Sequence, residues 1–155
     1  MADARCLGNR RGETLPGETV DVVAGGTATI DVGDVIIPDD GNPGYWRKVA
    51  NGEISTEATE VRVAITASDE TAGADGTCEA FVGAEMVISM VATTPANLVQ
   101  AVIGTKVTVD VTAGVITVDE NDTTNGFLEI LRPPTGAAGF DTTNGVMLVL
   151  ANGII

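Results

Sequence analysis

Histidine is absent from this sequence of 155 residues, aromatic residues make up 3% of it, and serine occurs only at Ser55, Ser68 and Ser89. The absence of histidine removes the commonest general base together with the commonest metal ligand. None of the three serines lies in the glycine-flanked turn that presents a nucleophile in hydrolases, and no glycine-rich phosphate loop is present. We therefore predict that the protein is not an enzyme and needs no cofactor.

Basic residues are also scarce, with eight Lys and Arg against 22 Asp and Glu, which gives a formal charge of −14. Such an acidic surface repels phosphate backbones and anionic membranes, so we expect no nucleic-acid partner and no membrane partner. The longest apolar runs, such as VMLVLA, are too short to span a bilayer, and no secretory signal is visible at the start. We expect the chain to be made in the cytoplasm.

The two cysteines and the acidic loop at 119–126 offer few ligands for a metal. Cys6 and Cys78 lie far apart, and two free thiols are expected, with a disulfide between them as the alternative. The loop DENDTTNG offers oxygen ligands to a calcium ion, but it lacks the ligand spacing of a calcium-binding loop. The favoured interpretation is that its Asp and Asn side chains bind nearby backbone amides, so no metal site is predicted.

Glycine, threonine and branched apolar residues dominate what is present, which favours short strands joined by tight turns. In TVDVV at 19–23, Val20 and Val22 share one face, and EVRVAITA at 60–67 alternates in the same way. FVGAEMVISMVA at 81–92 indicates one longer strand with a bend at Gly83. TTPANLVQAVIG at 93–104 fits either a short helix that begins at Pro95 or a strand over 98–103.

The last third carries the clearest patterns. KVTVDV and GVITVD predict a hairpin whose turn is Thr112-Ala113-Gly114. DTTNG then occurs twice, at 122–126 and 141–145, each time followed by an apolar strand. The two copies predict two similarly started strands of one sheet. In all, about nine strands and at most one short helix indicate an all-β fold, a small β-barrel or sandwich.

The first 18 residues differ from the rest. They lack periodicity, and residues 1–11 carry Arg5, Arg10 and Arg11 against one acid, which leaves a charge of −16 on the remaining 144 residues. Leu7 and Leu15 add apolar anchors. We predict an extended N-terminal docking arm over 1–18, and the alternative is a disordered tail without a binding role. Residues 19–155 are predicted to form a β-rich body, either continuous or with a distinct insertion at about 45–100.

A second candidate interface lies in the body, at Tyr45, Trp46 and Arg47. These are the residue types that dominate binding energy at protein interfaces. The alternative is an ordinary strand in which Trp46 packs inward and Arg47 is exposed.

The segment GTKVTVDVTAGVITV at 104–118, with NGFLEIL and NGVMLVLANG after it, resembles the carboxy-terminal part of tailed-phage capsid decoration (head cement) proteins. TVDVVAGGTATIDVGDVII resembles their amino-terminal pattern. The resemblance implies a β-tulip-like protein on the outer capsid surface of the virion. It also implies that the protein bridges neighbouring subunits of the major capsid protein, that it forms a homotrimer, and that residues 2–15 pair with capsid strands.

Two other functions remain open from the sequence. A virion fibre or surface carbohydrate-binding β-domain requires an exposed aromatic platform, which only Tyr45 and Trp46 can supply. An enzyme with a carboxylate pair requires acids that converge in a pocket, and no spacing in the sequence points to one.

Overall fold

A computed structural model describes residues 4–25, 29–98, 102–134 and 137–153, and over these residues the fold is all-β. Helical structure in the described chain is limited to the 3₁₀ turn η1 (Pro95–Asn97) and to Val102, which is also in 3₁₀ conformation. The strands are β1 (Arg5–Asn9), β2 (Gly17–Val22), β3 (Val35–Pro38), β4 (Trp46–Lys48), β5 (Arg62–Ala64), β6 (Gly76–Phe81), β7 (Met86–Val91), β8 (Lys106–Thr112), β9 (Val115–Asp119), β10 (Leu128–Arg132) and β11 (Val146–Ala151).

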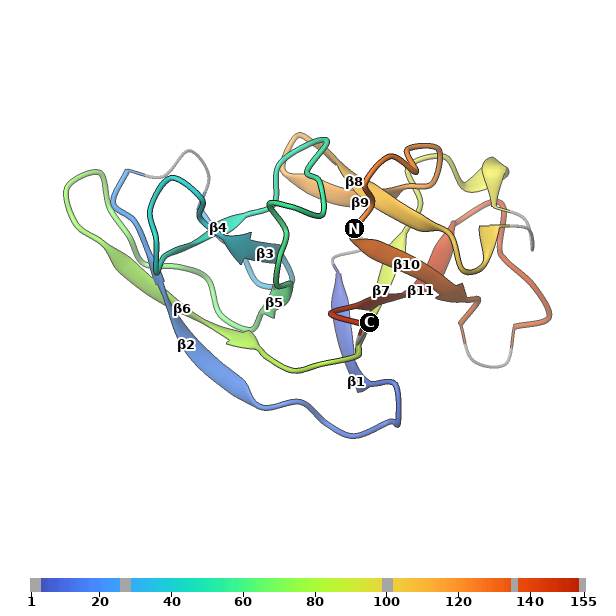
Figure 1. The fold of residues 1–155 in the computed structure, drawn as a ribbon, viewed down its shortest axis with the longest axis horizontal. Coiled ribbons are helices and arrows are strands. Elements are labelled where there is room, and N and C mark those ends of the chain that lie inside the picture. The colour runs from blue at the N-terminus through green and yellow to red at the C-terminus, as the bar shows by residue number, and fades with distance from the viewer. Residues whose placement is uncertain (1–3, 26–28, 99–101, 135–136, 154–155) are drawn as a thin grey trace.

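The strands form two antiparallel sheets that lie side by side (Figure 1). Sheet A has the order β1-β7-β11-β10-β8-β9, and sheet B has the order β2-β6-β5-β3-β4. Each sheet curls, so that one parallel bridge joins elements that are not neighbours in the sheet: Asp21 to Tyr45 across sheet B, and Ala92, just after β7, to Val118 of β9 in sheet A. Neither bridge extends into a ladder, so the architecture is a pair of curled sheets.

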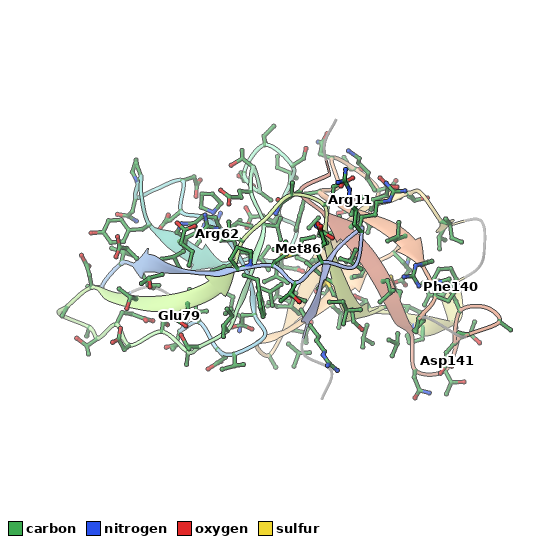
Figure 2. The ribbon with its side chains drawn as sticks, turned by 90° about the horizontal axis from the view of Figure 1, so that it is seen from below. Arg11, Arg62, Glu79, Met86, Phe140 and Asp141 are labelled. Atoms are coloured by element: carbon green, nitrogen blue, oxygen red, sulfur yellow. The ribbon has the colours of Figure 1, made fainter. Side chains whose placement is uncertain are left out.

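One continuous apolar cluster joins the two sheets. Val35, Ile37 and Val63 of sheet B belong to the same cluster as Met86 and Ile130 of sheet A, and all five side chains are almost fully buried. Figure 2 shows Met86 near the middle of the molecule, with Arg62 and Glu79 towards one end and Phe140 and Asp141 at the other. The sheets therefore form a single packed body.

The period-2 pattern predicted for residues 19–23 is confirmed, whereas the alternating segment 60–67 forms only the short β5, whose three residues are all buried. Val20 and Val22 are buried in β2 while Thr19 and Asp21 are exposed. The predicted hairpin is β8–β9, but Thr112 pairs directly with Val115, so its turn has two residues and not three. Both turn residues have positive φ, 51° and 81°, which is the conformation that matches the twist of a tight hairpin.

The DTTNG repeat is explained by two similar turns. Asp122 and Asp141 each accept a hydrogen bond through Oδ1 from the backbone N–H two residues further on. Each turn contains a residue of positive φ, Asn125 at 53° and Gly145 at 73°. The strands that follow, β10 and β11, pair in sheet A, as the repeat predicts.

One local prediction needs correction, and one pair of alternatives is decided. Residues 81–92 do not form one strand: β6 ends at Phe81 in sheet B and β7 begins at Met86 in sheet A, because Gly83 and Glu85 (φ 51°) redirect the chain. In the segment 93–104 the helical alternative is confirmed at its start, because the 3₁₀ turn η1 begins at Pro95, and residues 99–101 of the alternative strand lie outside the described chain.

The extended N-terminal arm is not confirmed. Residues 5–9 form a strand of sheet A, and Gly17 already begins β2 of sheet B. The physical reason is burial, since Ala4 and Leu15 both pack into the main apolar cluster with 9% exposure or less. Residues 2 and 3 of the predicted capsid-pairing segment lie outside the described chain.

Candidate protein-docking surface

The arginines of the N-terminal segment are displayed by an edge strand. β1 lies at the edge of sheet A and pairs with β7, with Arg5 opposite Ser89 and a bulge between Cys6 and Gly8. Bulges at sheet edges re-aim side chains, and Leu7 at this bulge is 45% exposed. A Cβ on Gly8 (φ 107°) would overlap the backbone oxygen of Glu13, so only glycine allows the chain to fold back here.

A tight turn after β1 holds the next two arginines. The Asn9 carbonyl Oδ1 accepts hydrogen bonds from the backbone N–H groups of Arg11 (2.9 Å) and Glu13 (3.0 Å). The Arg10 N–H donates to the backbone oxygen of Glu85 at 2.9 Å, which attaches the turn to the chain just before β7. Both arginine side chains are exposed, and Figure 2 shows Arg11 at the surface.

Next to this turn a groove of about 470 Å³ crosses the outer face of sheet A. Its apolar walls are Leu7, Val87, Leu131 and Leu148, and Arg10 and Arg132 also line it. Val87 and Leu148 are buried below the surface, whereas Leu7 projects from it. We define the β1 face as Arg5, Leu7, Arg10, Arg11, Arg132 and the apolar side chains Val87, Leu131 and Leu148.

The electrostatics of the β1 face differ from those of the rest of the molecule. It gathers four of the eight cationic residues of a chain whose net charge is −14. Arginines beside exposed apolar side chains are typical of protein contact sites, because guanidinium groups pair bidentately with carboxylates and pack on apolar surface. The arrangement suits binding of an acidic and partly apolar protein surface.

The structure unites most, but not all, of the residues that the sequence analysis placed in a docking segment. Arg5, Leu7 and Arg10 lie on or beside β1. Leu15 differs from them in being buried: it is 9% exposed, it lines a small cavity together with Arg5 and Leu7, and its methyl groups fill the space beside Gly83. In this fold Leu15 therefore packs in the apolar core below the β1 strand.

The second candidate interface is largely internal. Trp46 is 9% exposed, and the Arg62 guanidinium carbon lies 4.2 Å from its ring centroid. The Tyr45 hydroxyl donates to Asp75 Oδ2 at 2.8 Å, and this hydrogen bond, with the negative charge of Asp75, raises the pKa of Tyr45. Trp46 is thus not an exposed aromatic platform for a sugar, and only a small part of its side chain is open to a neighbouring groove.

Arg47 completes that segment and is tied to two carboxylates. Its Nη1 and Nη2 atoms lie 2.7 and 2.9 Å from the two oxygens of Glu53, and Nη2 lies 3.3 Å from Asp40 Oδ1. Beside it, Lys48 Nζ is 2.8 Å from Asp34 Oδ2. Both cations are engaged in structural ion pairs.

The possible metal and disulfide sites also have structural explanations. Asp119 Oδ1 accepts hydrogen bonds from the N–H groups of Asn121 and Asp122, so this loop is held by its own turns. Within the described residues, no group of three or more acidic, Cys or His side chains is arranged to hold a metal ion. Cys6 and Cys78 are both free thiols, and burial, with nearby acidic groups, raises the pKa of Cys78 to about 11.

Sequence reasoning missed the groove residues Val87, Leu131, Arg132 and Leu148. One signal was available for Leu148, because VMLVLA is apolar at every position and therefore predicts a strand covered on both faces. The residues that cover the second face of this strand are set by the pairing of β1 with β7. No local sequence pattern indicates that pairing.

Comparison with known proteins adds no identification: no family model, curated protein or solved structure matches the chain. Over the part of the chain that the structure describes, none of the helical segments has the length and apolar character that membrane crossing requires.

Proposed function

We propose that this protein is a structural decoration protein that binds the outer surface of a tailed-phage head through its β1 face and bridges neighbouring major capsid subunits. The observation that carries the docking role is that Arg5 and the exposed Leu7 lie on an edge strand, with Arg10 and Arg11 in the turn that follows it, on an otherwise acidic body. The partner class comes from the resemblance of the strand-and-turn segments to head cement proteins.

In this proposal the docking element is a fixed strand and not a loose arm. β1 is held in place by β7 and by the Asn9 turn before any partner arrives. Docking therefore requires little ordering of the chain, which lowers the entropic cost of binding. Bridging by many copies on one shell adds avidity, so that each single contact needs only modest affinity.

The test is binding to undecorated expanded heads, measured by co-sedimentation. Leu7→Asp is expected to reduce occupancy at least about tenfold, because it places a carboxylate in the apolar contact. Val32→Asp is the matched control: Val32 is also exposed, at 58%, but lies in a loop that leads to sheet B. Equal binding by Leu7→Asp and wild type would refute the role of the β1 face.

Two charge-reversal variants test the electrostatic contribution to binding. Arg10→Glu and Lys106→Glu change the net charge equally, but only Arg10 belongs to the β1 face. Arg10→Glu is expected to weaken binding and reduce its salt dependence, while Lys106→Glu leaves both close to wild type. Absence of any binding to heads by the wild-type protein would refute the capsid role itself. Sedimentation of the free protein measures whether it forms the expected trimer.

A further inference from the structure

A second groove lies in sheet B, between its two edge strands. β2 and β4 run in the same direction and touch at one bridge, Asp21 to Tyr45. Just beyond the bridge the strands border a groove of about 650 Å³, with residues 22–25 on one side and residues 46–48 on the other. No residue of the β1 face lines it, so the two surfaces can be tested separately.

The β4 side of this groove presents open strand backbone. The Tyr45 oxygen accepts from the Asp39 N–H (2.8 Å) and the Val49 N–H donates to the Val35 oxygen (3.0 Å), so odd-numbered residues of this segment face β3. Because alternate residues of an antiparallel strand point their backbone groups to opposite sides, Lys48 turns its N–H and C=O away from β3. Among the described residues only Arg47 reaches them, with Nη1 3.5 Å from the Lys48 oxygen.

Acidic side chains outnumber basic side chains along the groove. Glu53, Glu57 and Asp39 line it together with Arg47 and Lys48, but Lys48 pairs with Asp34, which lies outside the lining. Glu53 uses both its oxygens on Arg47. The Glu57 carboxylate lies beside that of Glu53, and the hydrogen bond between them, with partial desolvation and repulsion from the negative charges of Glu53 and Asp40, raises the pKa of Glu57. A cation placed beside Glu57 would relieve that repulsion.

We propose that the groove between β2 and β4 binds an extended segment of a partner protein that alternates apolar and basic residues. The segment would add as a strand to the open side of β4, with its apolar side chains towards Val22 and Trp46 and a basic side chain beside Glu57. Strand addition of this kind takes its affinity from backbone hydrogen bonds and its specificity from alternate side chains. This site is additional to the β1 face and does not rest on the capsid role.

The probe is the acetylated and amidated peptide Thr-Val-Lys-Val-Lys-Val-Thr, compared with the same peptide carrying Glu in place of Lys. Trp46 is the only tryptophan of the chain and lines the groove, so its fluorescence reports occupancy directly. The lysine peptide is expected to give a saturable change and to bind at least about tenfold more tightly than the glutamate peptide. A lysine peptide N-methylated at alternate residues is expected to lose binding, because it lacks the N–H groups for strand pairing.

Two substitutions separate this site from general attraction to an acidic protein. Glu57→Gln is expected to weaken the lysine peptide about threefold, the effect of one exposed charge pair. Glu79→Gln makes the same charge change on β6, outside the groove, and is expected to leave affinity unchanged. No fluorescence change, equal binding of both peptides, or equal effects of the two substitutions would overturn the proposal.

Discussion

We predict that hydrogen bonds from the side chain of Asn152 make a large contribution to holding the two sheets together. It follows β11 of sheet A, and its Oδ1 accepts from the Val61 N–H at 2.8 Å while its Nδ2 donates to the Val61 oxygen at 2.5 Å and the Gly83 oxygen at 3.3 Å. Val61 is only 1% exposed, so its N–H and C=O have little access to water while the Asn152 side chain covers them. Asn152 also has a positive φ of 52°.

These contacts set the expected magnitudes. Asn152→Gly leaves the N–H and C=O of Val61 without partners, and at about 1–3 kcal/mol for each buried group the loss is about 3 kcal/mol after partial relaxation. Asn152→Ala adds about 1 kcal/mol, because alanine is strained at positive φ. For a chain of this size, 3 kcal/mol corresponds to a fall in Tm of about 10 °C.

The assay is urea unfolding followed by circular dichroism, with Asn125 as the matched control. Asn125 has nearly the same φ, 53°, but its side chain is exposed. Asn125→Gly is therefore expected to change the free energy of unfolding by no more than about 0.5 kcal/mol. The reasoning is refuted if Asn152→Gly is equally mild, or if the two glycine variants cannot be distinguished.

Two further predictions concern packing and acid stability. Gly76→Ala is expected to destabilise the protein by about 1–3 kcal/mol in the same assay, because its Cβ would overlap the backbone of Glu70, whereas Gly73→Ala, in open space, should be neutral; equal stabilities would contradict this. Burial acts to raise the pKa of Glu53, but its hydrogen bonds, above all from Arg47, hold it below its ordinary value. As the pH falls, the unfolded chain therefore binds a proton at Glu53 before the folded protein does. The contribution of Glu53 to the free energy of unfolding is complete above about pH 4.3 and is lost as the pH falls further. Glu53→Gln should be less stable than wild type at pH 7 and lose less stability in acid, and a stability–pH profile equal to that of wild type would contradict this role of Glu53.

Much of the local structure could be predicted from the sequence because short-range chemistry decides it. Alternation places Val20 and Val22 on the buried face of β2, and the Ala113-Gly114 step allows the tight turn of β8–β9. The two DTTNG copies begin neighbouring strands because an Asp side chain caps its own turn wherever it stands. These patterns need no knowledge of the rest of the chain.

The candidate site could be predicted less well from the sequence, because it depends on pairings between segments that are distant in the chain. The arginine-bearing, aperiodic sequence of the first 18 residues predicts a loose arm. In the structure Arg5 pairs opposite Ser89, and this pairing makes residues 5–9 an edge strand. In the same way, Trp46 reads as a possible exposed anchor until Arg62, sixteen positions later, covers its ring.

By itself, the sequence determined the all-β class, the turns and the absence of histidine chemistry, since composition and nearest-neighbour geometry are properties of the chain alone. The tertiary structure alone decided which strands are edges, which arginines share a face with Leu7, and that β2 and β4 border a groove. The physical reason is that strand pairing and burial are settled by competition among all segments for the same partners, and no single segment contains the outcome.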